Sequence, residues 1–238
     1  MTFVAYNATM DSAISIDFGQ PFPLFPLPNC VLLPHATIPL HIFEPRYRQM
    51  TGDALDNNNL IAMALFDGDE WKDEYYNTPP LRPHVCVGYI VRHESLDDGR
   101  YNILLQGVCR AKLIEETPND PYRLGYLEPI EHQQSMEIDL GDQRVKLETL
   151  LNDPLLKSLS SVSAIHNWLS AEIPTSVLVD LAIMSICDDI EQRYAMLANN
   201  ETISRAKWLL EHLKVTRQTL AIAEKFGNGQ STDGHNLN

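Results

Sequence analysis

The sequence predicts an α+β protein, in which a small β-barrel is followed by an α-helical bundle. Short apolar runs separated by turn residues fill residues 24–130, a pattern typical of many short strands. From residue 141 onward the apolar residues recur with the period of helices. Of the 238 residues, 44% are hydrophobic and 21% are charged, which is enough apolar material for a sizeable core.

Four segments are expected from this change of pattern. We expect a flexible arm over residues 1–21, with a short ordered piece at Ile14–Phe18, because no clear period is visible there. The barrel should occupy residues 22–135 and the helical bundle residues 136–226. The polar, glycine-bearing residues 227–238 are typical of a disordered tail.

The barrel should begin with a proline-rich segment over residues 24–48. Each proline fixes φ and removes a backbone donor, so this segment cannot be one long helix. It reads as two extended pieces, Cys30–Leu33 and Thr37–Phe43, joined by a turn at Pro34-His35. A helix should start near Pro45, where the missing N–H costs little.

Further strands are expected along the rest of the barrel. Gly99 follows two aspartates and supplies the positive φ of a hairpin turn, and Gly107 interrupts an apolar run as a bulge does. Many short strands and a single early helix imply a strongly bent barrel. The strands should cover Leu60–Phe66, Val85–Arg92, Tyr101–Gln106, Val108–Glu115 and Arg123–Glu128.

The bundle should contain five helices, of which the last is the longest. Asp188 and Glu191 have the spacing of a capping box, and the last helix keeps one largely apolar face. That face must cover something, so we expect the barrel and bundle to pack together with a cleft between them. The helices should cover Gln143–Leu151, Val162–Ala171, Thr175–Cys187, Ile190–Ala198 and Ile203–Phe226.

Two ordered sets of residues resemble the N-terminal, substrate-binding domain of the Lon protease family. The first reads PLFPL over residues 23–27, VLLP over 31–34 and PLHIFEPRY over 39–47. The second reads VGYI over 87–90, DGRY over 98–101 and QGVCR over 106–110. The resemblance implies a PUA-like barrel followed by a helical bundle, as in a stand-alone Lon-domain protein.

The resemblance also implies binding of unfolded or partly folded polypeptide, as an adaptor or sensor in protein quality control. Lon proteases carry an ATPase and a Ser–Lys peptidase module after this domain, and 238 residues leave no room for them. No glycine is followed by the lysine of a P-loop, and no Gly-x-Ser-x-Gly elbow occurs. The chain is therefore expected not to be an enzyme, to need no cofactor, and to act alone or with a protease complex.

The net charge of the chain weighs against two classes of binding partner, nucleic acids and anionic membranes. Lys+Arg 18 against Asp+Glu 32 gives a formal net charge of −14, which opposes binding to phosphate backbones and to anionic membranes. An RNA-binding PUA-like module is the alternative function, and this charge weighs against it. The N-terminus lacks the basic and apolar regions of a signal peptide, so we expect a cytoplasmic protein without a membrane partner.

Five residues are candidates for contacting a peptide. The aromatic residues of an acidic loop at 67–76 suit an interface, although such charged loops are more often simply solvated. The histidine of the hallmark segment is interpreted either as a peptide contact or as a barrel-facing or interface residue paired with a local backbone group. The candidates are His41, Phe43, Tyr47, Trp71 and Tyr75.

Two structural expectations accompany these candidates. Leu40, Phe43, Val87 and Leu105 should be buried in the barrel, so that Phe43→Ala would cost roughly 3–5 kcal/mol. Glu44 and Arg46 should form a structural ion pair or a helix cap.

No metal site is expected. The four cysteines are scattered without a Cys-x-x-Cys spacing, and Cys30, Cys86 and Cys109 fall inside apolar strands as small hydrophobic residues. The loop from Asp67 resembles the opening of an EF-hand, but Lys72 stands where the calcium loop needs glycine.

Overall fold

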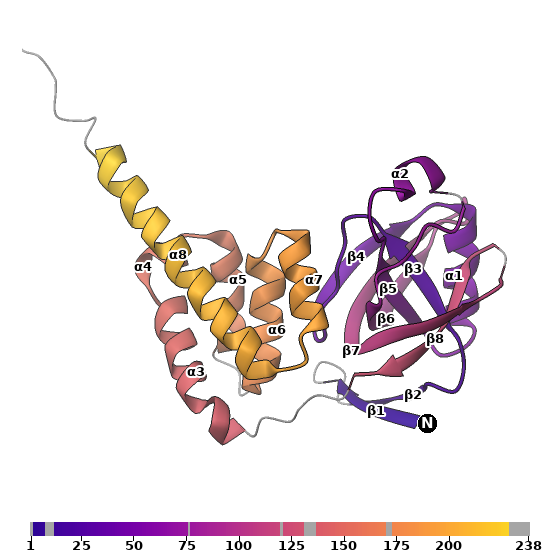
Figure 1. The fold of residues 1–238 in the computed structure, drawn as a ribbon, viewed down its shortest axis with the longest axis horizontal. Helices are drawn as coiled ribbons and strands as arrows, with labels where there is room; N and C mark the ends of the chain where they lie inside the picture. Colours follow the sequence, from indigo (N-terminus) through magenta and orange to yellow (C-terminus); the bar gives the residue numbers. More distant parts are fainter. Residues whose placement is uncertain are drawn as a thin grey trace, which may run out of the picture. The chain divides into compact units, whose positions relative to one another are not determined.

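The computed structural model describes residues 2–7, 12–75, 77–119, 121–130, 137–169 and 173–228. The chain divides into two compact units (Figure 1). The first comprises Met1–Gln133 and Cys187–Asn200, and the second comprises Gln134–Ile186 and Glu201–Asn238.

The first unit is built around a six-stranded sheet that closes on itself. The order is β4-β7-β6-β5-β3-β8, and β8 also pairs with β7, which closes β7, β6, β5, β3 and β8 into a barrel with β4 on the free part of the β7 edge. Among the strands of the described residues, β3 and β5 are the only parallel pair. The strands are β3 (Phe22–Leu27), β4 (Thr37–Ile42), β5 (Leu60–Leu65), β6 (His84–Ser95), β7 (Tyr101–Thr117) and β8 (Arg123–Pro129).

The long strand β7 makes this closure possible because its two halves have different neighbours. On one edge, its first half pairs with β4 and its second half pairs with β8, while β6 runs along the other edge. The β6–β7 register shifts at Gly88, which faces Gly107, so the bulge expected at Gly107 is confirmed. A Cβ on Gly107 would lie 2.2 Å from the Leu33 carbonyl oxygen, so only glycine permits this close approach.

The β6–β7 hairpin turns at the glycine that the sequence indicates. Gly99 has φ +76°, which glycine adopts without strain. The carbonyl of Gly99 accepts a hydrogen bond of 2.6 Å from Arg48 Nε, which ties the turn to the helix that follows β4.

The N-terminal residues form a hairpin instead of the loose arm expected from the sequence. Strands β1 (Thr2–Asn7) and β2 (Ser12–Asp17) pair antiparallel. Ile14, Ile16 and Phe18 are buried in the barrel's hydrophobic cluster with residues of β3, β5, β6, β7 and β8. These three residues coincide with the short ordered piece expected at Ile14–Phe18, and their period-2 alternation is that of a strand.

Two helices interrupt the barrel strands. Helix α1 (Pro45–Leu55) starts at the expected proline and contacts β3, β4 and β5. Its buried residues include Tyr47, Met50 and Ala54, which cover the sheet. The short helix α2 (Trp71–Glu74) lies in the acidic loop, of which Tyr76 is outside the described residues.

Helix α7 (Ile190–Ala198) belongs to the barrel unit, although its periodicity alone assigns it to the bundle. The buried guanidinium of Arg110 on β7 donates to the carbonyls of Leu197 at 3.1 Å and Met196 at 3.4 Å. These carbonyls lie in the last turn of α7, where a cation is favourable. The arginine of the Gly-x-x-Arg segment therefore holds α7 on the barrel.

The N-terminus of α7 differs from the expected capping box. Asp189, not Asp188, is the N-cap residue, and its carboxylate accepts from the backbone N–H of Gln192 at 2.8 Å. Arg82 pairs with Glu191 on the first turn at 2.7 Å. The hydroxyl of Tyr194 accepts from the backbone N–H of His84 at 3.0 Å.

The second unit is entirely helical among its described residues. The helices match the expected ones within a few residues, except that α3 starts earlier and the short α4 was not anticipated. Residues 131–136, around the expected boundary between barrel and bundle, and residues 229–238 of the expected tail lie outside the described residues. The helices are α3 (Glu137–Leu151), α4 (Pro154–Lys157), α5 (Ser160–Leu169), α6 (Thr175–Ile186) and α8 (Thr202–Asn228).

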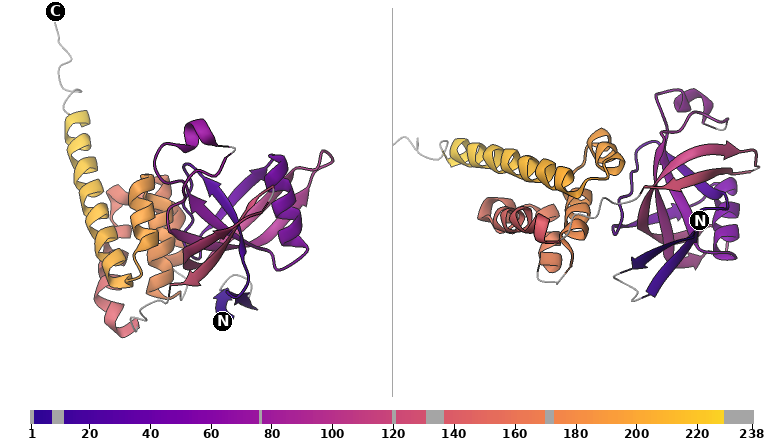
Figure 2. Two further views of the ribbon diagram at one scale, coloured as in Figure 1. Left: turned by 45° about the vertical axis from the view of Figure 1, so that its right-hand side comes forward. Right: turned by 60° about the horizontal axis from the view of Figure 1, so that its bottom comes forward.

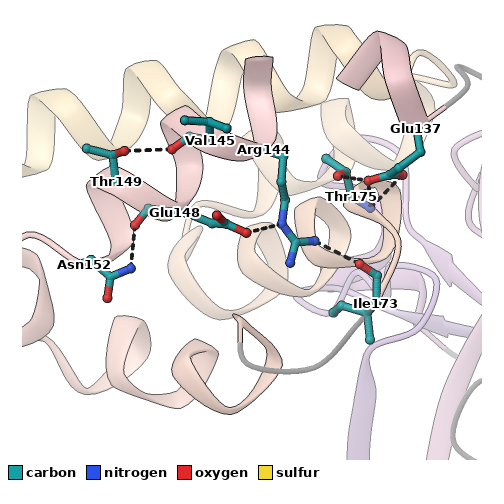
Figure 3. A network of polar contacts seen from close by, with 8 residues as sticks. All are labelled: Glu137, Arg144, Val145, Glu148, Thr149, Asn152, Ile173 and Thr175. Carbon is teal, nitrogen blue, oxygen red and sulfur yellow. Dashed lines mark hydrogen bonds and ion pairs between the residues drawn. The ribbon is translucent and has the colours of Figure 1, made fainter. Parts of the chain in front are cut away.

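Polar contacts tie these helices together (Figure 3). The Glu137 carboxylate accepts from the backbone N–H of Thr175 at 3.1 Å and from its hydroxyl, so α3 provides an anion at the N-terminus of α6. Arg144 bonds Glu148 and the carbonyl of Ile173, which holds the segment that precedes α6. Deeper in the unit, Arg205 of α8 pairs with Asp180 of α6 at 2.9 Å, and both side chains are buried.

Candidate functional site

The five candidate residues fall into two groups on the barrel unit. His41 and Phe43 stand at the exposed end of β4, and we call them the β4 patch. The other three candidates lie elsewhere: Tyr47 and Tyr75 flank the guanidinium of Arg46, and Trp71 stacks on Phe66. The structure thus joins residues of α1 to a loop that lies about 30 positions further along the chain.

Phe43 is 60% exposed, so the expectation that it is buried in the barrel is wrong. Side chains alternate along a strand, and Ile42 points inward while His41 and Phe43 share the outward face. Val87 and Leu105 are buried as expected, whereas Leu40 is only half-buried. The expected loss of 3–5 kcal/mol for Phe43→Ala therefore does not apply.

The ring of His41 is held by polar neighbours on both sides. Arg100 can only donate, so the 3.1 Å contact to Nε2 makes that nitrogen the acceptor. Nδ1 then carries the proton and donates to Asn102 Oδ1 at 2.7 Å. Phe43 stacks on this oriented ring, with centroids 6.2 Å apart and planes inclined by 24°. The β4 patch is therefore an ordered aromatic surface open to solvent.

The second group centres on the Glu-Pro-Arg-Tyr segment that opens α1. Arg46 pairs with Glu44 at 3.1 Å, so the expected ion pair is present, while the Glu44 side chain makes no cap hydrogen bond. The Arg46 guanidinium lies 4.5 Å from the ring centroid of Tyr47 and 4.6 Å from that of Tyr75. Tyr75 also donates its hydroxyl to Glu44 at 2.7 Å. Arg46 is thus placed between two tyrosine rings as a cation–π centre.

Aromatic packing supports this cluster from the other side. Phe66 stacks on Trp71 with centroids 5.9 Å apart and meets the edge of Tyr75 at the same distance. Tyr47 packs against Phe25 at 4.6 Å. Burial raises the pKa of Tyr47 above its usual value, and burial together with Glu44 raises that of Tyr75. Both phenols stay neutral at neutral pH, and Tyr47 is buried while Tyr75 is half-buried, so only Tyr75 keeps part of its surface open to solvent.

Two adjacent pockets run along α1, and together we call them the α1 groove. One has a volume of about 420 Å³ and begins at Arg46 and Tyr47 in the first turn of α1. The other has a volume of about 430 Å³ and lies at Asp53 and Ala54 in the last turn. Tyr122 lines both, so the two pockets are neighbours separated by its side chain.

Two hydrogen bonds hold Tyr122 in place in the groove. Its hydroxyl donates to Asp53 Oδ2 at 2.7 Å, and its carbonyl accepts from Asn119 Nδ2 at 2.8 Å. Burial and the Asp53 carboxylate raise the pKa of Tyr122 to about 12. The loop before β8 is thereby held against α1. The hydrogen bond between Tyr122 and Asp53 lies where the two pockets meet.

The composition of the groove suits a peptide better than a charged ligand. Phe22, Pro23 and Pro121 offer apolar contacts, and Asn77 and Asn58 offer amides at its rim. The two arginines of the groove are already balanced, since Arg46 pairs with Glu44 and Arg123 pairs with Glu116 at 2.6 Å. Because both arginines already have acidic partners, the groove is poorly suited to binding the phosphate backbone of a nucleic acid.

Two searches of the described residues bear on other classes of site. Across those residues, no group of three His, Cys, Asp or Glu side chains is arranged to hold a metal ion. The helices in the described parts of the chain are all too short or too polar to cross a bilayer.

Of the residues that line the groove, only Tyr47 is a sequence candidate, and Tyr122, which lines both pockets, is among those that the sequence did not reveal. Tyr122 lies in a loop after Pro118 and Pro121, where a lone tyrosine carries no periodicity. The alternation of prolines with aromatic and amide residues was the available indication of a contact surface. Its partner Asp53 is 69 positions away, so only the fold brings the two together.

The barrel with α1 and the hallmark segments can now be compared with known proteins. The family model of the ATP-dependent protease La (LON) substrate-binding domain matches residues 21–215 of this chain. The chain belongs to this family.

Similar curated proteins are Lon proteases of bacteria. Lon protease 2 of Myxococcus xanthus is 22% identical over 211 residues, covering 88% of this chain and 25% of that protein. The Lon protease of Dictyoglomus thermophilum is 24% identical over 221 residues, covering 89% of this chain and 26% of that protein. The chain thus spans about a quarter of the length of these relatives.

Two solved structures share the fold. The Lon N-terminal domain protein from Xanthomonas campestris has a TM-score of 0.59 and 21% identity, covering 81% of this chain and 98% of that one. The N-terminal domain of the Mycobacterium avium complex Lon protease has a TM-score of 0.62 and 13% identity, covering 82% and 98%. At these identities the likeness concerns the fold alone.

Proposed function

We propose that this chain is a non-catalytic module that binds unfolded or partly folded polypeptide, as an adaptor or sensor in cytoplasmic protein quality control. Membership of the LON substrate-binding domain family supports the class of ligand. The observation that carries the proposal is the α1 groove, a pair of adjacent pockets of about 420 and 430 Å³ on that domain. Pockets of this size accept side chains of a peptide.

The proposed binding surface consists of the α1 groove and the β4 patch. Phe43 lies three positions before Arg46, which lines the first pocket, so the patch adjoins the groove in sequence. An extended segment would place apolar side chains in the two pockets, on either side of Tyr122, and against the rings of Phe43 and His41. Tyr47 lines the first pocket, and Tyr75 and Trp71 support it through Arg46 and Phe66.

Affinity should be modest and specificity broad. An unfolded ligand loses chain entropy on binding, which offsets part of the contact energy. The groove presents prolines, tyrosines and amides, which can serve many sequences in the manner of an adaptable interface. Broad recognition is what a module for unfolded clients requires.

Filling the pockets tests the position of the ligand. The probe is fluorescently labelled, carboxymethylated α-lactalbumin, a permanently unfolded chain, and binding is followed by anisotropy. Thr78→Trp in the first pocket and Asn58→Trp in the second place a large ring on exposed positions, so folding should not suffer. We expect each to weaken binding about tenfold or more, whereas Ser95→Trp, exposed at the end of β6, should not.

The β4 patch is tested by a matched pair of variants. Phe43 and Ile114 are 60% and 56% exposed on the same unit, so Phe43→Ser and Ile114→Ser remove similar apolar surface. Only Phe43→Ser should weaken binding of the unfolded probe. Unchanged binding in Phe43→Ser and in both tryptophan variants would overturn the proposed surface.

Two further experiments address the role. The purified protein should show no ATP hydrolysis and no casein degradation, and turnover in either assay would overturn the non-catalytic assignment. An affinity capture from native extract distinguishes the two roles, because one defined partner indicates an adaptor and a heterogeneous set of misfolded proteins indicates a sensor. Fractionation of the native cells tests the cytoplasmic location.

A further inference from the structure

The C-terminal half of α8 has an apolar face that its own unit leaves uncovered. The face that packs into the bundle is formed by Arg205, Ala206, Leu209 and Leu213, all fully buried. Figure 1 shows α8 extending past the other helices of the second unit, and Figure 2 shows the same from two other sides. Val215, Ile222 and Phe226 on this extension are 54%, 55% and 76% exposed.

These exposed residues lie on one line along the helix. Successive residues turn by 100°, so positions separated by seven and eleven fall within about 20° of each other. The line continues back to Trp208, whose ring stacks on His212 with centroids 5.0 Å apart. At 100° per residue, the middle of the line is turned by roughly 115° from the middle of the buried side, so the line flanks the bundle core instead of belonging to it.

The line has the spacing of a coiled-coil seam. Its members alternate at intervals of four and three residues, which is the repeat of a and d positions. In heptad terms, Trp208, Val215 and Ile222 occupy d, and the remaining members occupy a. The full line is Trp208, His212, Val215, Thr219, Ile222 and Phe226.

We propose that this face docks a second copy of the chain through an antiparallel two-stranded coiled coil whose overlap is centred on Arg217. In antiparallel pairs a residues meet d residues of the partner helix. This register places Trp208 against the partner's Phe226 at both ends, and Val215 against the partner's Thr219 near the centre. The overlap from Trp208 to Phe226 is 19 residues, or about 28 Å.

Complementary charges beside the seam favour a second copy of the chain as the partner and an antiparallel orientation of the two helices. The g positions beside the seam are Glu211, Gln218 and Lys225, all exposed. In an antiparallel pair g residues face g residues, so Glu211 meets the partner's Lys225, Lys225 meets the partner's Glu211, and Gln218 meets its own copy. A parallel pair would instead place these charges opposite e positions, where Thr216 and Ala223 stand. The present partner of Glu211 is Lys214 at 3.4 Å, an exposed pair that is readily exchanged.

Sedimentation equilibrium of the full chain tests the contact. The mass should rise from 27.0 kDa toward twice that value with increasing protein concentration. Ile222→Ser and Phe226→Ser should each hold the mass at 27.0 kDa over the same range. Val145→Ser is the control, because Val145 is 63% exposed on α3 of the same unit but lies off the seam.

Exchanged charges test the direction. Glu211→Lys alone places lysine opposite lysine, and Lys225→Glu alone places glutamate opposite glutamate, so each variant should associate several-fold more weakly. An equimolar mixture of the two restores both attractive pairs and should recover the association of the parent. A monomer at all concentrations, or a dimer unaffected by Ile222→Ser and Phe226→Ser, would overturn the contact, and a mixture no stronger than its components would overturn the antiparallel register.

Discussion

Replacing Arg110 by methionine should release α7 from the barrel. Arg110 is fully buried, and its guanidinium donates to the Leu197 carbonyl at 3.1 Å and the Met196 carbonyl at 3.4 Å. Methionine keeps much of the apolar stem but supplies no donor, so both carbonyls lose a buried partner. Arg110→Lys keeps the charge without the planar fork, and its effect should lie between those of arginine and methionine.

The magnitude follows from the two bonds. A hydrogen bond from a charged donor contributes roughly 1.5–3 kcal/mol, and the longer contact adds less, about 1 kcal/mol. The free energy of unfolding of the barrel unit should therefore fall by about 2–4 kcal/mol. For a unit of this size, that corresponds to a melting temperature lowered by about 4–16 °C.

Thermal unfolding and hydrogen exchange measure this loss. Exchange should accelerate most in the amides of Ile190–Ala198, because those residues lose their anchor, while α6 and α8 of the second unit keep their protection. Arg100→Met is the control, since Arg100 is exposed and its loss should change stability by less than about 0.5 kcal/mol. An Arg110→Met protein with parental stability and unchanged exchange in α7 would refute the role given to this arginine.

The other predictions concern burial, backbone space and pH. Asp180→Asn leaves Arg205 without its buried ionic partner and should cost about 3–5 kcal/mol, measured by denaturant unfolding. Gly107→Ala forces a methyl group onto a carbonyl oxygen 2.2 Å away and should cost about 3 kcal/mol or more in the same assay. Phe43→Ala removes an exposed ring and should change stability by less than about 0.5 kcal/mol. The pKa of the Tyr122 hydroxyl is raised to about 12. The stability contributed by this hydroxyl is therefore complete below about pH 10 and is lost as pH rises toward 12. In an ultraviolet titration, Tyr122→Phe should lack one phenolate transition at high pH.

Two substitutions in α3 serve as controls for the stability predictions. Asp142→Asn changes an acid whose side chain is 88% exposed, so its effect should stay below about 0.5 kcal/mol. Gly141→Ala meets open space in a helix and should stabilise by about 0.5–1 kcal/mol. Equal costs for Asp180→Asn and Asp142→Asn would contradict the buried ion pair, and a tolerated Gly107→Ala would contradict the close approach at the bulge. A loss of several kcal/mol in Phe43→Ala would show that this ring is packed after all, and a Tyr122→Phe titration identical to the parent's would disprove the raised pKa.

The sequence by itself determined the architecture and the position of most elements. Prolines prevent a helix over residues 24–44 and permit one from Pro45, and Gly99 and Gly107 mark a turn and a bulge. These constraints act on single residues and their immediate neighbours, so they can be read without knowing what lies across the molecule. The hallmark segments added the family and, with it, the barrel.

The tertiary structure alone decided which surfaces remain open. Ile190–Ala198 has the periodicity of a bundle helix, and only its contacts with Arg110, Arg82 and His84, more than 80 positions away, assign it to the barrel. Phe43 is apolar but exposed because β4 presents it on the solvent side, and Tyr122 becomes part of a site only through Asp53 of α1. Periodicity reports that a face is apolar, but burial depends on which distant segment arrives to cover it, and that is settled by packing of the whole chain.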